Sequence, residues 1–485
     1  MAHRRERAAR GGETRRGVGR SPAAVLATVA AILTAPLAAM AQDGVAATTA
    51  PAGEKAAGLW QRDTLTGDWG GMRSALEEKG FQIGVVYTGE ALGNPAGGVG
   101  HGAIYEGRLE TALDVDLEKA AGWTGAAFHV NAYQIHGRGL SANYLGNNLL
   151  TASNIEASRA TRLFDLWLQQ KLFDGALSVR VGQLAADDEF VTSEYGATFV
   201  NGTFGWPGLL AADAASGGPA YPLATPGIRV AVMPSDALTL SAAVFNGNPA
   251  GPGSGNPQLR DDSGTSFRIG DGAFAIAEAA YARNQDKDAA GLAATYKLGA
   301  FYQRGRFDDL RYDDGGLALA DPASSGRPAV RHTHFGFYAV VDQMIWRREA
   351  GSDQGLGVFA RVMGDPTAAN QVAFYADGGV NYKGLLAERP DDVLGVAFAY
   401  AGISGEARGA DGDTRRFTGT DRPIRDFEAV LEVTYKAQVA PWWTLQPDLQ
   451  LIFHPGGGIA PPSDTTGSAA IPDALVLGLR TVVTF

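Results

Sequence analysis

The chain has 485 residues, a net charge of −11 and no cysteine. The absence of thiols excludes a disulfide framework and any thiolate metal site, and the acidic balance argues against a nucleic-acid partner. The 65 glycines are spread along the chain without a collagen-like period, so composition does not indicate a fibrous protein.

The first predicted element is an export signal at residues 1–41. Seven arginines and two glutamates precede an apolar run at residues 23–38, and Ala39-Met40-Ala41 completes an Ala-x-Ala cleavage pattern. The alternative is a membrane anchor, but the run contains Pro36 and is shorter than the roughly 20 residues that a spanning helix needs. We therefore expect a cleaved secretory signal peptide.

Two short segments are predicted after the signal. Residues 42–60 are rich in Ala, Gly, Thr and Pro and bury too little apolar surface to order, which predicts a flexible periplasmic lead. Residues 61–80 carry the clearest helix signal after the export signal, with Asp68 as the predicted cap and Gly80 as the left-handed residue that ends the helix. No other stretch after the signal reaches the length of a transmembrane helix.

From Phe81 onward the hydrophobic pattern has a period of two, which is the period of β-strands. In the clearest segment, residues 108–118, apolar side chains alternate with charged ones, and in residues 164–171 Phe164, Leu166 and Leu168 share the predicted apolar face. The alternation recurs at 177–181, 228–232, 356–362, 426–436, 445–453 and 475–485. The strands of a soluble β-sandwich also alternate between apolar and polar residues. So many strands with one apolar and one ionic face nevertheless favour a barrel whose outer face contacts lipid and whose inner face lines a water-filled lumen.

The last strand ends in the aromatic Phe485, as at the end of a bacterial outer-membrane barrel. The predicted fold class is all-β, a transmembrane antiparallel β-barrel of about 16 strands over residues 81–485, because about 400 residues at roughly 10 per strand suit 16 to 18 strands. Residues 201–222, 248–264 and 308–330 lack alternation. We expect these long loops to fold into the lumen or to lie over its mouth.

Several motifs resemble those of one family, the carbohydrate-selective porins (OprB family) of bacterial outer membranes. The opening motif is Thr66-Gly67-Asp68-Trp69-Gly70-Gly71-Met72-Arg73. Further motifs follow in order at residues 94–98, 162–170, 181–183, 199–207, 219–222, 355–361, 382–386, 389–395, 446–450, 454–457 and 478–481. The resemblance implies a sixteen-stranded barrel in the outer membrane that conducts glucose and related sugars, with no cofactor; the preferred sugar is not implied.

The polar faces of the predicted strands supply the residues expected to line this lumen. A sugar ring needs several shallow donors and acceptors and an apolar surface, and conduction needs weak binding. The channel-lining candidates are Arg108, Glu110, Asp114, Asp116, Trp167, Lys171, Arg180, Arg229, Arg361, Glu432, Lys436, Asp448 and Arg480. Of these, Arg108, Arg180, Arg229 and Arg361 are expected to share the constriction with acidic residues.

Each of these residues also has a structural interpretation. The arginines could pair with neighbouring carboxylates and brace the wall without touching solute, and Trp167 could belong to an interfacial aromatic belt. Trp442 and Trp443 are expected to be belt residues.

Other functions receive less support from the sequence. His332 and His334 could form a metal pair on one strand face, but no closing carboxylate is evident, so we predict no metal site. Acidic runs at 187–189, 308–309 and 313–314 could collect calcium or simply be solvated. No Gly-x-Ser-x-Gly elbow occurs, so we predict no enzyme. A non-selective porin and a structural barrel without conductance remain alternatives, and monomer and homotrimer are both open.

Overall fold

The structure is a computed structural model, and it describes residues 58–146, 149–286, 288–461, 463–464 and 467–485. The predicted signal peptide and most of the predicted lead lie outside these residues.

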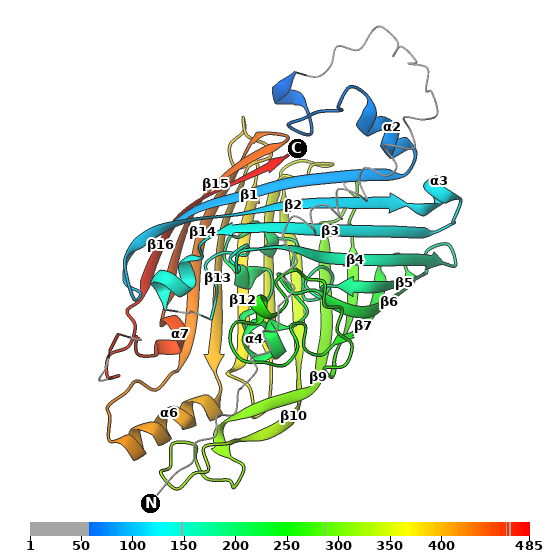
Figure 1. Cartoon of the computed structure of the whole chain (residues 1–485). Helices are drawn as coiled ribbons and strands as arrows, with labels where there is room; N and C mark the ends of the chain where they lie inside the picture. Colours follow the sequence, from blue (N-terminus) through cyan, green and yellow to red (C-terminus); the bar gives the residue numbers. More distant parts are fainter. Residues whose placement is uncertain (1–57, 147–148, 287, 462, 465–466) are drawn as a thin grey trace, which may run out of the picture. The chain divides into compact units, whose positions relative to one another are not determined.

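Sixteen antiparallel strands close into one barrel in the described part of the chain, because β1 pairs with both β2 and β16 (Figure 1). This confirms the predicted fold class. The strands are β1 Phe81–Ala96, β2 Gly102–Asp116, β3 Ala126–Gly137, β4 Ala160–Leu172, β5 Leu177–Leu184, β6 Thr225–Ser235, β7 Leu238–Asn246, β8 Ala273–Arg283, β9 Ala294–Asp313, β10 Pro328–Arg347, β11 Gly355–Gly364, β12 Val372–Lys383, β13 Val393–Ile403, β14 Phe427–Ala440, β15 Trp443–Phe453 and β16 Ala474–Thr484.

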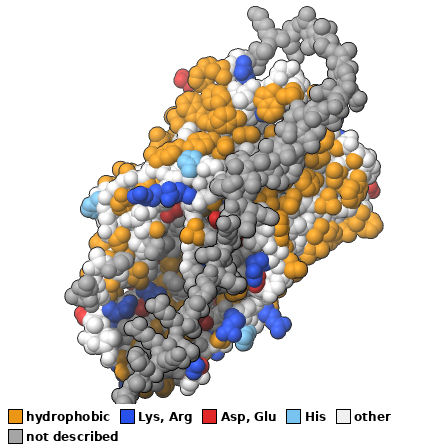
Figure 2. Space-filling model, viewed as in Figure 1, with side chains coloured by type: hydrophobic (Ala, Val, Ile, Leu, Met, Phe, Trp, Pro, Cys, Tyr) orange, Lys and Arg blue, Asp and Glu red, His pale blue; other side chains and the backbone are white. Residues whose placement is uncertain are grey.

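The two faces of the wall differ as the period-two pattern predicts. In β16, Leu477 and Leu479 are 47% and 49% exposed, whereas Val476 and Arg480 on either side of them are buried. Figure 2 shows hydrophobic side chains gathered over the outer surface of the strands on the side in view. The exposed face is therefore apolar, as contact with lipid requires, and the polar side chains are turned inward.

Helices are short and lie between or before the strands. They are α2 Met72–Glu78, α3 Leu117–Ala121, α4 Gly208–Asp213, α5 Pro257–Arg260, α6 Gly405–Thr418 and α7 Pro455–Gly458, with single turns η1 Leu59–Gln61, η2 Ser141–Leu145, η3 Gly196–Thr198, η4 Gly202–Phe204 and η5 Ala215–Gly217. None of the described helices has the length and apolar character to cross a membrane.

Within the predicted segment 61–80 the α-helix spans only Met72–Glu78 (α2), and its N-cap is Gly71 and not the predicted Asp68. The segment is attached to the end of the barrel. Asp68 Oδ1 accepts hydrogen bonds from the backbone N–H and the hydroxyl of Ser74, and Gly80 has a φ of +89°. Arg73 Nη2 donates to the carbonyl of Phe485 at 2.8 Å. The helix therefore lies beside the C-terminus, at the same end of the barrel in Figure 1.

Three expectations about the strands were wrong in detail. Strand β2 ends at Asp116, whose carboxylate caps α3 by accepting from the N–H groups of Glu118 and Lys119, so Asp116 is a helix cap. Phe164 is buried against Tyr133 and not on the lipid face, because a bulge in the β3–β4 pairing shifts the alternation. The loop predicted at 308–330 is limited to 314–327, since β9 extends to Asp313 and β10 begins at Pro328.

Connections at the two ends of the barrel differ in length. At the end that carries α2, neighbouring strands are joined by segments such as 173–176, 236–237 and 441–442, whereas the opposite end carries segments 138–159, 185–224, 247–272 and 404–426. Figure 1 shows α6 and the β9–β10 hairpin at this second end and α4 within the outline of the barrel. Segment 185–224 is called the internal loop below, because its contacts place it inside the lumen.

Candidate functional site

The internal loop lies against strands on several sides of the barrel at once. Its residue Val191 donates a backbone hydrogen bond to Glu278 of β8 at 3.0 Å, and the backbone N–H of Val200 donates to Glu432 of β14 at 2.6 Å. Arg480 of β16 reaches the carbonyl of Val200. One segment can reach such distant strands only from the interior, so the polar faces of these strands point into the lumen.

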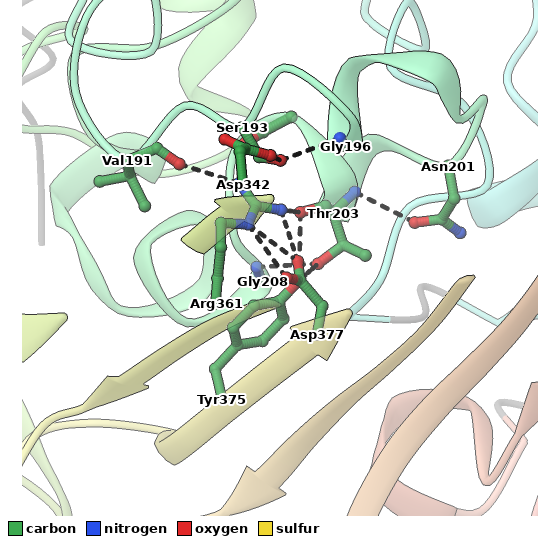
Figure 3. A network of polar contacts seen from close by, with 11 residues as sticks. Val191, Ser193, Gly196, Asn201, Thr203, Gly208, Asp342, Arg361, Tyr375 and Asp377 are labelled. Carbon is green, nitrogen blue, oxygen red and sulfur yellow. Dashed lines mark hydrogen bonds and ion pairs between the residues drawn. The ribbon is translucent and has the colours of Figure 1, made fainter. Parts of the chain in front are cut away.

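Arg361 on β11 is the main cationic anchor of the internal loop (Figure 3). Its guanidinium donates to the carbonyls of Val191, Thr203 and Gly205 at 3.1, 2.8 and 2.8 Å, and it forms an ion pair with Asp377 on β12. Strand register places the two side chains directly opposite each other. Because Arg361 is only 2% exposed, it lies beneath the loop and is not in the open lumen.

Wall carboxylates hold the same loop by accepting its backbone N–H groups. Glu432 accepts from Val200 and Asn201 at 2.6 and 3.0 Å, and Asp342 accepts from the hydroxyl of Ser193 at 2.5 Å. Charged acceptors make stronger hydrogen bonds than neutral ones. We call this side of the lumen the covered wall, and its predicted members are Arg361, Glu432, Asp448 and Arg480, all at most 7% exposed.

The inward face of β2–β5 remains partly open to solvent. We call it the open wall; its residues are Arg108, Glu110, Asp114, His129, Trp167, Gln169, Lys171 and Arg180, with Glu189 from the internal loop and Arg229 beside it on β6. Every one of the predicted residues in this set lies on the polar face. Positively charged, negatively charged and aromatic side chains therefore share one surface.

Glu189 bridges two arginines at the centre of the open wall. Its carboxylate lies 2.6 Å from Arg180 Nη1 and 2.7 Å from Arg229 Nε, and register places these arginines side by side. The Gln169 amide oxygen accepts from both guanidinium groups at 3.0 Å. A single carboxylate thus separates two like charges that would otherwise repel each other.

Trp167 supports this cluster from the neighbouring strand. The Arg180 guanidinium carbon lies 3.9 Å from the centre of the indole ring, and His129 stacks on that ring with centroids 5.0 Å apart. Such stacking fixes the plane of the arginine and the direction of its donors. Trp167 therefore faces the lumen and is not a member of an interfacial belt.

Arg108 forms a second group on the open wall. It lies 4.7 Å from the ring centre of Tyr133 and 5.1 Å from that of Tyr221, and 3.6 Å from Glu110. Tyr221 belongs to the internal loop, and its N–H donates to Asp187 Oδ2 at 2.9 Å. The two arginine groups are thus linked through the acidic run at 187–189.

The loops near this wall enclose a cavity of about 480 Å³. Aromatic and acidic side chains line it, among them Trp206, Tyr221 and Glu156. Trp206 Nε1 donates to the carbonyl of Gly217 at 2.9 Å, which fixes the ring. A cavity with flat apolar rings and polar edges suits a small polar ring molecule.

Lys436, the remaining predicted residue, lies apart from both walls. It lines a second hollow together with Trp60, Lys383 and Pro441, at the end of the barrel that carries the short turns. Trp442 is buried and stacks on Trp443 and on Trp60.

Several partners of the predicted residues were missed by sequence reasoning. Glu189 follows β5 within an acidic run whose sequence predicts a solvated or calcium-binding loop, and no sequence pattern indicates that two arginines pair with it. Asp377 is the single acid in β12, which is a usable signal for an inward ion pair. Asp342 and Glu428 hold backbone N–H groups about 150 and 280 residues away in the chain, which no local pattern reveals.

The chain is similar to known porins over most of its length. The family model described as "Carbohydrate-selective porin, OprB family" matches residues 100–485. Porin B of Pseudomonas aeruginosa is 28% identical over 419 residues, which cover 81% of this chain and 87% of that protein. The putative porin QuiX of Acinetobacter baylyi is 24% identical over 428 residues, 82% and 90% of the two chains. The high-pH structure of Pseudomonas putida OprB superposes with a TM-score of 0.78 at 25% identity and covers 88% of this chain and 100% of that one.

Proposed function

Because the chain belongs to the OprB family of carbohydrate-selective porins, and is therefore an outer-membrane sugar porin, we propose that sugars cross it along the open wall. The Arg180–Glu189–Arg229 cluster beside Trp167 is the observation that carries this assignment. The long connections, which include α6, face outside the cell, and α2 and the short turns face the periplasm. The cavity beside Trp206 and Tyr221 then lies where solute enters.

The chemistry of the open wall suits a sugar better than an ion. A pyranose presents hydroxyl groups that both donate and accept and carbon–hydrogen faces that contact aromatic edges. Arginine donors, carboxylate acceptors and the edges of Trp167 and Tyr221 occur together there. Since acids and bases alternate, no single sign of charge is filtered, and each contact with solute is shallow enough for release.

Swelling of liposomes that contain the mature protein tests this proposal. We expect isotonic D-glucose to enter severalfold faster than mannitol, because mannitol is acyclic, of nearly the same mass, and lacks the rigid ring face. Equal rates for the two solutes would favour the non-selective porin, since such a channel sorts by size. Liposomes that do not swell in either solute would favour the structural barrel.

The ion selectivity of the lumen should shift toward anions as pH falls through neutrality. Burial, followed by the negative charge of Asp188, raises the pKa of the Asp187 carboxyl to about 7. A raised pKa means that Asp187 is charged at pH 8 and mostly neutral at pH 6, so a negative charge is lost on acidification. Reversal potentials across planar bilayers measure this change. Asp187→Asn should give, at both pH values, the selectivity that the wild type has at pH 6; an unchanged pH response in this variant would contradict the assignment.

A further inference from the structure

A histidine and two aspartates from three separate elements meet on the covered side of the lumen. Asp213 is the last residue of α4 in the internal loop, His334 lies on β10, and Asp365 directly follows β11. One potential ligand atom from each residue lies within 4.8 Å of the other two. No other group of this kind occurs among the residues that the structure describes.

The imidazole of His334 is buried without the hydrogen bonds that a buried ring normally makes. It is 1% exposed; its Nδ1 has no polar partner, and its Nε2 meets only Asp365 Oδ2, with which it forms an ion pair. The rings of Phe301 and Phe307 lie 5.3 and 5.6 Å from the imidazole. Buried polar atoms left in this condition need a further partner.

Hydrogen bonds from neighbouring groups orient the carboxylates of Asp365 and Asp213. Asp365 Oδ1 accepts from the N–H and the hydroxyl of Thr367 at 2.8 and 2.6 Å, which leaves Oδ2 directed at His334. Asp213 accepts from the N–H groups of Gln371 and Val372 at 2.6 and 3.2 Å. Each carboxylate oxygen has two lone pairs, so Asp213 can still bind a cation. Hydrogen bonds of this type orient metal ligands in proteins.

We propose that Asp213, His334 and Asp365 bind a first-row divalent cation, with Zn²⁺ as the best fit. One imidazole nitrogen and two carboxylate oxygens are the donors that Zn²⁺ accepts at roughly 2.0–2.2 Å, and a fourth position remains for water. Calcium is less suitable, because it takes six to eight oxygen ligands. This differs from the sequence-based expectation of no metal, which considered His332 as the partner of His334; His332 is exposed and is not part of the group.

Such an ion would fasten the internal loop to the barrel wall. Asp213 belongs to the loop, whereas His334 and Asp365 belong to the wall and to the β11–β12 connection. The cation would supplement the Arg361 anchor at a second point. The proposal is independent of which solute passes through the lumen.

Zinc binding by untagged mature protein tests the site directly. After chelator treatment and dialysis, titration calorimetry and elemental analysis should find one tightly bound Zn²⁺ per chain. We expect His334→Gln and Asp365→Asn each to weaken this binding by about 100-fold or more, since even second-shell changes cost 10- to 100-fold. His332→Gln and Asp308→Asn are matched controls, because both wild-type side chains are exposed and neither belongs to the group; both should bind zinc like the wild type.

Two results would overturn the proposal. Equal binding by wild type and His334→Gln would assign the zinc to surface histidines, and no binding by wild type would leave a buried ion pair only. Because a ligand variant could fail to fold, Co²⁺ absorption on the wild type provides an independent readout. A d–d band that Zn²⁺ displaces at one equivalent supports the site, and the absence of any such band refutes it. Parallel titrations with Ca²⁺ and Mg²⁺ should show no comparable binding.

Discussion

Replacing Arg361 by methionine is expected to lower the free energy of unfolding by about 3–5 kcal/mol, the usual cost of removing one partner of a buried ion pair. The variant leaves Asp377 buried without its cation and removes the donors of three internal-loop carbonyls. Urea unfolding in lipid vesicles, followed by tryptophan fluorescence, measures this loss. Single-channel recordings should also show a larger and noisier conductance, because the loop that narrows the lumen is less firmly held.

Two further variants separate the anchoring role from a general effect of losing an arginine. Arg304→Met removes an exposed arginine from β9 and should change stability little. Arg361→Met combined with Asp377→Leu should recover part of the lost stability, because no buried carboxylate is then left unpaired. If R361M proved as stable as R304M and conducted normally, Arg361 would not anchor the loop.

The strands could be predicted because lipid and water impose a simple rule on each of them. In β16, the side chains of Leu477 and Leu479 face the outside of the barrel and that of Arg480 faces the lumen. Because successive side chains of a strand point to opposite faces, a few residues are enough to reveal this alternation in the sequence. The same rule was the basis for choosing the thirteen predicted lumen residues, Asp116 among them. It failed at Phe164, where one bulge exchanges the two faces, and at Asp116, where the strand ends in a helix cap.

Helix α6 could not be predicted from hydrophobic periodicity. Its sequence, Gly405–Thr418, contains arginines, acids and glycines, and only Ala407 and Asp411 are buried. The helix is held by polar contacts, which include an ion pair between Asp413 and Arg311 of β9 at 2.7 Å. Ser404 Oγ accepts from the N–H of Ala407 at 3.1 Å, and Asp411 pairs with Arg425 at 2.8 Å. Helix caps and ion pairs of this kind can be identified only when the structure shows which residues are partners.

The division of the lumen into two walls also lay beyond sequence reasoning. Arg180 and Arg361 occupy equivalent positions on polar strand faces, yet one is 18% exposed at its side chain and the other 1%. The difference arises because the internal loop packs closely against β8–β16 and leaves the inward face of β2–β5 partly open. Its contacts join residues more than 150 positions apart. A strand pattern reports which face is inward, and not what covers it.

Glu189→Gln should raise the preference of the channel for anions over cations by about tenfold and weaken sugar binding. In a wet lumen, removing one negative charge at about 6 Å favours a passing anion and disfavours a passing cation by roughly 0.7 kcal/mol each, so their relative permeability changes by about tenfold. Without the carboxylate, the adjacent guanidinium groups of Arg180 and Arg229 repel each other and lose their common acceptor. Their donors are then no longer held where a sugar hydroxyl would meet them.

Reversal potentials under a salt gradient and the block of ion current by glucose measure the two effects separately. Glu388→Gln, in the exposed turn between β12 and β13, removes the same charge away from the lumen and is the matched control. Restoring a shorter carboxylate with Glu189→Asp should recover most of the ion selectivity, because that effect depends on charge. It should recover less of the sugar binding, because bridging two arginines at 2.6 and 2.7 Å depends on reach. If E189Q and E388Q gave the same currents and the same glucose block, the passage would not run along the open wall.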